Sequence, residues 1–276
     1  EGSTEPLRVK TQRHDPTMTS FTPNEIMTIA AARELTSADV CFVGIGLPSA
    51  ACNVARLSHE PDITLIYESG TIATEPNVLP LSIGDGELCE TALVTVSVPE
   101  MFRYWLQGGR INKGFLSAAQ LDRFANINTT VIGPYDRPRV KLPGAGGAPE
   151  IATSCGEILI VMAQSKRSFV EKLDFVTSLG HGKGGDDRRR QGVTTKGPTK
   201  VITDLCVMEP DPETKELTVT ALHPGVTPEQ VAAATGWSLK FAASLDETTT
   251  PGDAELKVLR DLHRRTNDAH QAKAAQ

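Results

Sequence analysis

The sequence lacks the features that mark several large classes of protein. No apolar stretch approaches the roughly 20 residues that a helix needs to cross a membrane, and residues 1–20 lack the apolar run of a secretory signal. The 28 Lys and Arg residues form no long stripe, and the net charge of −6 disfavours binding to nucleic acid or to an anionic membrane. We therefore expect a cytoplasmic protein that acts on a small molecule or on another protein.

Cysteine is scarce and never paired. The five cysteines stand singly without a C-x-x-C pair, which disfavours both a zinc site and a disulfide framework. His181 and His223 each lie near glycine at a predicted strand end, without a third group at the spacing of a catalytic triad or metal site. We predict that both histidines are structural and that the chain holds no metal.

The hydrophobic pattern predicts an α/β protein with a mainly parallel sheet and flanking helices. Residues 39–44 and 62–67 are short apolar runs typical of strands, and residues 48–57 between them fit a helix. A strand, a helix and a second strand imply a parallel pair. We expect a flexible polar tail over residues 1–20 and a single domain over 21–276, which ends in a polar helix and tail.

Other elements follow from the same patterns. Thr22-Pro23-Asn24-Glu25 has the spacing of a capping box and predicts a helix start. Apolar runs predict strands at residues 93–98, 157–163, 176–180, 200–205 and 216–222, and helical spacing predicts helices at residues 99–107, 227–234 and 251–270. Residues 134–150 and 180–198 are rich in Gly, Pro or charge and are predicted to be loops.

Glu68 is the candidate catalytic residue that the local pattern suggests, in the run Tyr67-Glu68-Ser69-Gly70. It follows a predicted buried strand, and ligands of open α/β sheets bind at the carboxyl ends of strands. The local sequence alone favours a plainer role, in which Glu68 caps the next turn or pairs with a surface arginine. A serine nucleophile is disfavoured because Ser69 lacks the first glycine of G-x-S-x-G.

Two glycine-rich segments and one charged run have alternative interpretations. In Gly44-Ile45-Gly46-Leu47-Pro48, a dinucleotide fingerprint is disfavoured because Ser49 stands at the position of its third glycine. Residues 142–150 (LPGAGGAPE) fit either an oxyanion pocket or a tight surface turn. The run 186–190 (DDRRR) fits a solvated, mobile loop better than a phosphate site.

Five ordered motifs together resemble the B subunits of family I CoA-transferases. They are VGIGLPSAACNVAR (43–56), LIYESGTI (65–72), LSIGDGEL (81–88), FLSAAQLDRFANINTT (115–130) and LPGAGGAPEIA (142–152). The resemblance runs from about Phe21 to Trp237 and is nearest to the 3-oxoadipate branch, with the glutaconate branch next. Ser69 replaces the Asn of many members and fits the dicarboxylate branch, whereas Glu150 stands where Asp is more usual.

This resemblance implies roles for individual residues. It makes Glu68 the nucleophile that forms a glutamyl-CoA thioester, and it reverses the plainer local interpretation. The backbone N–H groups of Gly147 and Ala148 are implied to stabilise oxyanions. The implied substrate and CoA contacts are Gly44, Gly46, Pro48, Ser69, Gly70, Gln120, Gly144 and Gly146.

The resemblance also implies substrates and a partner. No cofactor is expected to be permanently bound, and coenzyme A enters as an acyl-CoA, expected to be succinyl-CoA, with 3-oxoadipate from aromatic-compound degradation as the acceptor. Glutaconate or another short dicarboxylate stays open as the acceptor, as does contact of loop 183–190 with CoA. A separate A subunit is implied, in a heterotetramer or a larger complex. Two other functions stay open: thioester hydrolysis or ring opening on the same scaffold, and a non-catalytic stabilising subunit.

Overall fold

The computed structural model describes residues 8–10 and 20–274. Its strands are β1 Arg8–Lys10, β2 Val40–Phe42, β3 Thr64–Ile66, β4 Thr71–Ile72, β5 Val94–Thr95, β6 Lys113–Leu116, β7 Gln120–Leu121, β8 Ile127–Asn128, β9 Val131–Ile132, β10 Val140–Lys141, β11 Glu157–Val161, β12 Pro198–Ile202, β13 Cys206–Pro210, β14 Leu217–Leu222 and β15 Lys240–Glu247. Its helices are α1 Pro23–Ala32, α2 Leu47–Ser58, α3 Gly86–Glu90, α4 Val98–Glu100, the π-helix η1 Met101–Leu106, α5 Ala148–Ser154, α6 Asp187–Arg190, α7 Pro228–Ala233 and α8 Asp253–Ala274.

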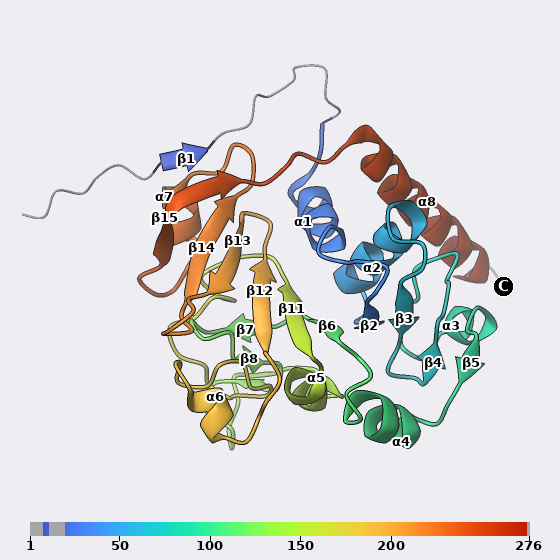
Figure 1. Cartoon of the computed structure of the whole chain (residues 1–276), viewed down its shortest axis with the longest axis horizontal. Coiled ribbons are helices and arrows are strands. Elements are labelled where there is room, and N and C mark those ends of the chain that lie inside the picture. The colour runs from blue at the N-terminus through green and yellow to red at the C-terminus, as the bar shows by residue number, and fades with distance from the viewer. Residues whose placement is uncertain (1–7, 11–19, 275–276) are drawn as a thin grey trace, which may run out of the picture.

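One sheet of 11 strands organises the described chain, in the order β1-β15-β14-β13-β12-β11-β6-β2-β3-β4-β5 (Figure 1). The central strands from β12 to β3 all run parallel to their neighbours. Antiparallel pairs flank this block at β12–β13–β14 and at β3–β4–β5. The predicted α/β class with a mainly parallel sheet and flanking helices is confirmed.

The central strands are buried on both faces, as parallel strands usually are. In β11, Ile158 and Ile160 belong to one apolar cluster, whereas Leu159 and Val161 belong to the other. Helices α1, α2 and α8 lie together on one side of the molecule in Figure 1, and the cluster of Leu159 contains residues from all three. The sheet is therefore a rigid support for the loops at its edges.

Helix starts are the best-predicted local features. The predicted capping box at Thr22 is present, because its hydroxyl accepts from Glu25 N–H at 3.2 Å and its own N–H donates to the Glu25 carboxylate at 2.8 Å. The predicted start at Thr227 likewise forms a capping box with Gln230. Both boxes involve contacts only three residues apart, which the sequence shows directly.

Several predicted elements differ from the structure. Residues 176–180 form no strand, because only Ser178 pairs, in an isolated bridge with Ile127. The predicted strand at 93–98 shortens to β5, and α6 lies within the predicted loop 180–198. The expected tail falls mostly outside the described residues, but Arg8–Lys10 within it forms β1 and pairs with β15.

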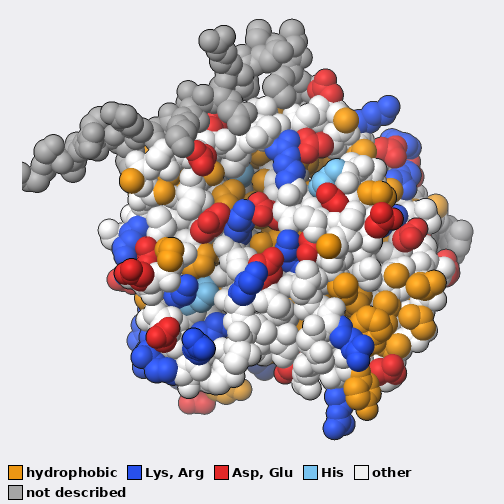
Figure 2. All heavy atoms as spheres, in the orientation of Figure 1, with side chains coloured by type: hydrophobic (Ala, Val, Ile, Leu, Met, Phe, Trp, Pro, Cys, Tyr) orange, Lys and Arg blue, Asp and Glu red, His pale blue; other side chains and the backbone are white. Residues whose placement is uncertain are grey.

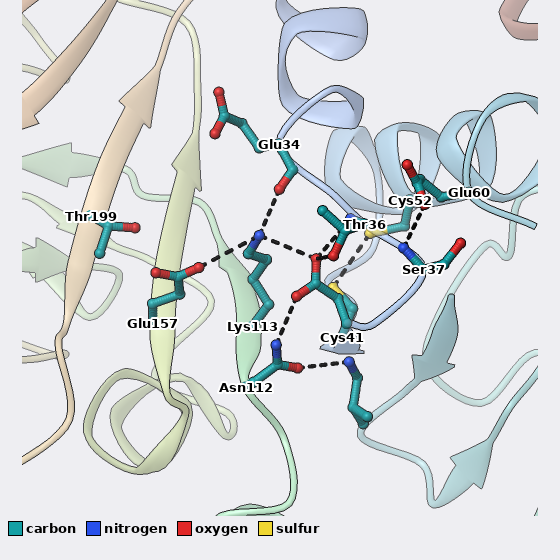
Figure 3. A network of polar contacts seen from close by, with 12 residues as sticks. Glu34, Thr36, Ser37, Cys41, Cys52, Glu60, Asn112, Lys113, Glu157 and Thr199 are labelled. Carbon is teal, nitrogen blue, oxygen red and sulfur yellow. Dashed lines mark hydrogen bonds and ion pairs between the residues drawn. The ribbon is translucent and has the colours of Figure 1, made fainter. Parts of the chain in front are cut away.

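A polar network joins the amino-terminal ends of the parallel strands (Figure 3). Glu68 follows the carboxyl end of β3, so it lies at the opposite edge of the sheet. The Lys113 ammonium at the start of β6 donates to the Glu34 carbonyl at 2.6 Å and to Asp39 Oδ2 at 3.2 Å, and it lies 3.5 Å from Glu157 Oε1. Asn112 donates to Asp39 Oδ1 at 2.7 Å. The network therefore links the end of α1 to β2, β6 and β11.

Across residues 8–10 and 20–274, no helix combines the length and the apolar content needed to span a membrane.

Candidate active site

Glu68 lies in a tight turn at the carboxyl end of β3. The turn runs from Tyr67 to Gly70, where the Gly70 N–H donates to the Tyr67 carbonyl at 3.0 Å and the chain returns as antiparallel β4. Gly70 has φ +99°, and a Cβ there would lie 2.0 Å from the Val96 carbonyl oxygen. Only glycine therefore fits at the position that closes the turn.

Tyr67 anchors the turn to helix α2. Its buried hydroxyl lies 2.7 Å from Ser49 Oγ, and the Asn53 amide donates to the same hydroxyl at 3.4 Å. Burial raises the pKa of Tyr67 far above its ordinary value, so the ring stays neutral. Tyr67, the residue before Glu68, is thus fixed in the protein interior, and this limits the positions that the Glu68 side chain can reach.

A pocket of ≈ 230 Å³ opens beside Glu68. Its lining consists of Phe42, Val43, Gly44, Ile45, Pro48, Glu68, Ile83, Phe115, Leu116, Ser117, Ala145, Gly146, Gly147, Ala148 and Ile151. Glu68 is the only charged residue of this lining, and most of the others are apolar or glycine. The pocket is therefore a mainly apolar surface with one carboxylate, a setting that favours a carboxylate nucleophile.

The pKa of Glu68 reflects this setting. Burial raises the pKa of Glu68 above the ordinary value, and the nearby Gly147 backbone N–H partly offsets the increase. The approach is close, since a Cβ on Gly147 would lie 2.9 Å from Glu68 Oε1 and 2.5 Å from Phe102 Cζ. The carboxylate is therefore partly desolvated and lies beside one backbone N–H.

The structure gathers six of the residues implied by the resemblance around the pocket: Gly44, Pro48, Glu68, Gly146, Gly147 and Ala148. Of the two implied oxyanion donors, Gly147 lies against the Glu68 carboxylate, whereas Ala148 N–H donates to the Ala145 carbonyl at 3.1 Å. The two backbone N–H groups thus have different surroundings.

The remaining implied residues lie outside the pocket lining. Gly46 caps the start of α2 with φ +85°, and Ser69 and Gly70 form the turn that carries Glu68. Gln120 lines a second cavity, and Gly144 lines a third. Gly46, Ser69 and Gly70 therefore support the pocket without lining it, whereas Gln120 and Gly144 line other cavities.

Sequence patterns did not reveal Phe102, whose ring lies against Gly147 beside the pocket. Phe102 comes from the π-helix η1, and its ring centroid lies 6.0 Å from that of Phe42. Irregular π-helical turns are frequent at functional sites, but no periodicity in the sequence marks one. Glu150 also gains an explanation: its Oε1 accepts from Gln107 at 3.0 Å and from Ser154 at 2.7 Å, which ties α5 to the end of η1.

The histidines and the charged run lie away from this pocket. His181 Nε2 lies 2.8 Å from the Pro198 carbonyl and His223 Nε2 lies 2.7 Å from the Thr203 carbonyl, so both rings have structural partners. The interpretation of the charged run as solvated is wrong for Arg188, which is buried. Its guanidinium donates to the carbonyls of Ala152, Leu179, Gly180 and Thr195 and to the Thr195 hydroxyl.

Comparison with known proteins identifies the family. Residues 24–234 match the family described as coenzyme A transferase. This chain belongs to the coenzyme A transferase family. It is 61% identical over 253 residues to the B subunit of 3-oxoadipate CoA-transferase from Pseudomonas knackmussii, covering 92% of this chain and 97% of that one.

A more distant member shares both sequence and structure. The B subunit of glutaconate CoA-transferase from Acidaminococcus fermentans is 33% identical over 249 residues, covering 88% of this chain and 92% of that one. The crystal structure of glutaconate coenzyme A-transferase from the same organism superposes with a TM-score of 0.82, at 32% identity, over 88% of this chain and 95% of that chain. The family resemblance read from the five motifs is thereby confirmed.

Proposed function

We propose that this chain is the nucleophile-bearing B subunit of a two-subunit CoA-transferase that moves CoA from succinyl-CoA to 3-oxoadipate. The observation that carries the proposal is the half-buried Glu68 carboxylate, which lines a mainly apolar pocket and lies against the backbone of Gly147. The substrate is proposed from the relative that is 61% identical, a subunit of 3-oxoadipate CoA-transferase. The five unpaired cysteines fit the reducing cytoplasm as the place of the reaction.

The reaction proceeds through three covalent states of Glu68, a thioester and the two anhydrides that precede and follow it. The carboxylate attacks the thioester carbonyl of the donor, and the C–S bond breaks. CoA leaves as a thiolate, and an acyl-glutamyl anhydride remains on Glu68. The thiolate attacks the glutamyl carbonyl of that anhydride, which releases the donor acid and leaves a glutamyl-CoA thioester. The acceptor carboxylate then attacks this thioester, and the returning thiolate attacks the acyl carbonyl of the new anhydride, which restores Glu68.

The pocket favours each of these steps. Partial desolvation destabilises the free carboxylate and makes it a stronger nucleophile than one in bulk water. Apolar walls keep water away from the anhydride, which would otherwise hydrolyse. Each tetrahedral intermediate carries an oxyanion, and the backbone N–H of Gly147 is close by because Gly147 lies against the Glu68 carboxylate.

An exposed apolar surface supports the proposed partner, a separate A subunit. Figure 2 shows hydrophobic side chains gathered over the region where β4, β5 and α4 lie in Figure 1. Leu93 and Val94 at edge strand β5 are 82% and 46% exposed, and Leu81 is 63% exposed. Ile83 joins this surface to the pocket, since it is 41% exposed and also lines the pocket. A surface of this kind is typical of an interface.

The test is activity of the chain co-purified with its A subunit, followed with a panel of acceptor acids. Glu68→Gln is expected to lower transfer on the order of 10⁴-fold, as loss of a nucleophile usually does. The matched control Glu90→Gln changes an exposed glutamate outside the pocket and should leave the rate unchanged. Full activity of the Glu68→Gln complex would indicate a non-catalytic subunit. Release of free CoA at the transfer rate without an acceptor would indicate a hydrolase.

A further inference from the structure

The lining of the Glu68 pocket contains no cationic side chain that could pair with the anionic parts of the proposed substrates. Glu68 is the only charged residue of the lining, whereas a dicarboxylate acceptor carries a second carboxylate and coenzyme A carries phosphates. A carboxylate brought near another carboxylate is disfavoured unless a cation or directed N–H groups hold it. If the proposed function is right, a site for an oxyanion must therefore lie within reach of the pocket.

A second cavity, of ≈ 480 Å³, is lined in part by a residue that is close in the sequence to the lining of the Glu68 pocket. Its lining is Gln120, Ile132, Arg139, Val140, Arg167 and Val170, so it joins two arginines and one amide to three apolar side chains. Ser117 lines the Glu68 pocket and Gln120 lines this cavity. Three residues of extended chain span at most about 10 Å, so the two cavities adjoin the same short segment.

In the described chain, neither Arg139 nor Arg167 has a carboxylate partner that would compete with a ligand for its guanidinium group. Among the residues that the structure describes, no carboxylate forms an ion pair with the guanidinium of Arg139 or Arg167, although ion pairs are frequent elsewhere on this chain. Arg139 and Arg167 are both exposed. The Arg139 side chain lies along the β9–β10 hairpin, since a Cβ on Gly133 would be 3.3 Å from its Cγ and Nε. Arg167 comes next to Ser168, whose carbonyl accepts from Leu121 N–H at 2.7 Å and so joins this segment to β7.

Gln120 adds a fixed donor to the cavity wall. Its side chain is only 6% exposed, and its Oε1 accepts from Asn128 Nδ2 at 2.8 Å. Asn128 is itself fixed, since the same Nδ2 donates to the Val131 carbonyl at 2.7 Å. This contact sets the orientation of the Gln120 amide, and within the described chain its Nε2 has no acceptor. The Gln120 Nε2 is not among the buried unpartnered atoms, so it is accessible and free to donate to a ligand in the cavity that it lines.

We propose that Gln120, Arg139 and Arg167 form an oxyanion subsite that holds the far end of the substrate while its reacting end lies at Glu68. Two planar guanidinium groups and an amide N–H suit a carboxylate or a phosphate, and the apolar residues beside them suit a short carbon chain. The oxyanion is either the second carboxylate of the acid or a phosphate of CoA. This inference rests on the proposed function and adds a specificity site to it.

The experiment compares Arg139→Gln, Arg167→Gln and the double variant in the A/B complex. The matched control is Arg137→Gln, an exposed arginine of the same hairpin that does not line the cavity. If the subsite holds the second carboxylate, each single variant should raise KM for dicarboxylic acceptors about 10-fold or more, without raising KM for a monocarboxylic acceptor such as acetate. If it holds a phosphate, KM for the acyl-CoA should rise for every acceptor.

Calorimetric titration separates the two sources directly. Adipate and adenosine 3′,5′-bisphosphate serve as unreactive probes of the complex, and the double variant should lose binding of one of them. Unchanged KM and unchanged binding in the double variant, with Glu68→Gln still inactive, would overturn the subsite and leave the proposed function standing. Failure of the double variant to form the A/B complex would also overturn it, because the arginines would then serve the interface.

Discussion

The backbone of Gly147 lies against the carboxylate of Glu68, and the space between them admits no side chain. A Cβ at Gly147 would lie 2.9 Å from Glu68 Oε1 and closer still to the ring of Phe102. This contact joins the turn after β3 to the glycine loop before α5, which are far apart in the sequence. The proposed nucleophile and the proposed oxyanion donor are thus adjacent in the fold.

Replacement of this glycine should therefore impair catalysis more than folding. We expect Gly147→Ala in the A/B complex to lower kcat on the order of 100-fold, because the methyl group displaces the Glu68 carboxylate or the Phe102 ring. Gly86→Ala is the matched control, since a Cβ there has no atom nearer than 3.7 Å. Steady-state kinetics with thermal melts of both variants test this. Wild-type kcat in Gly147→Ala would show that the close contact has no catalytic importance.

As the pH is lowered, activity should begin to fall at a higher pH than it would if the nucleophile were an exposed glutamate. Burial raises the pKa of Glu68 above 4.5, and only the ionised carboxylate attacks the thioester. The pH profile of kcat/KM for the acyl-CoA tests this, and an acidic limb at or below 4.5 would contradict it.

The same raised pKa has a consequence for stability. A folded-state pKa above the unfolded value stabilises the fold below pH 4.5, and this contribution is lost as the pH rises through the folded pKa. Glu68→Gln should therefore gain stability over the wild type toward neutral pH and lose that advantage below pH 4.5. Urea unfolding at both pH values measures the difference, and an advantage that is equal at both would count against the raised pKa.

The buried Arg188 should be the one arginine of its run that matters for stability. Its removal leaves the carbonyls of Ala152, Leu179 and Gly180 without their donor, so Arg188→Ala should lower the free energy of unfolding by about 3 kcal/mol. Arg189 is exposed, and Arg189→Ala should change it by less than about 0.5 kcal/mol. Urea unfolding of both variants checks the pair, and equal effects would mean that Arg188 is not buried.

The network at the opposite edge of the sheet gives a further stability prediction. Lys113→Met leaves the buried Asp39 without its cation and should cost about 3 kcal/mol. Lys196 pairs with Glu157 but is 73% exposed, so Lys196→Met should cost less than about 1 kcal/mol. Denaturant unfolding of both variants measures these costs, and a Lys113→Met cost as small as that of Lys196→Met would show that the network adds little.

The network also predicts a pH effect. Burial alone would raise the pKa of Asp39, but hydrogen bonds from Thr36 and Asn112 and the charge of Lys113 lower it below 3.8. Its stabilising contribution is therefore present above pH 3.8 and lost as the pH falls through the lower folded pKa. The difference between wild type and Lys113→Met should shrink in that acidic range.

Local sequence was sufficient where the contacts are local. The capping box at Thr22 and the parallel pair β2–β3 follow from neighbouring residues and from a simple chain connection. The predicted strand at 176–180 failed because its pairing depends on Ile127, for which no local pattern gives a signal. Strands β13 and β15 were not predicted for the same reason, because pairing with neighbouring strands, and no local pattern, identifies them as strands.

The residues of the site likewise divide into those that the local sequence marks and those that only the fold brings together. Glu68 stood out locally as a carboxylate at a strand end, but its proximity to Gly147 came only from the family resemblance, because the two are joined by the fold. Phe102 gave no signal, since a π-helical turn has no characteristic spacing in the sequence. Arg188 was misjudged because composition describes a charged run as a whole, whereas one side chain of it turns inward.

The glutamyl-CoA thioester is the intermediate on which the account depends. The A/B complex is incubated with succinyl-CoA without acceptor, quenched in acid, digested and analysed by mass spectrometry. We predict a CoA adduct on the peptide that contains Glu68, absent from Glu68→Gln and discharged when 3-oxoadipate is added before the quench. An adduct on another residue, or rapid transfer by a complex in which Glu68 never carries CoA, would contradict the account.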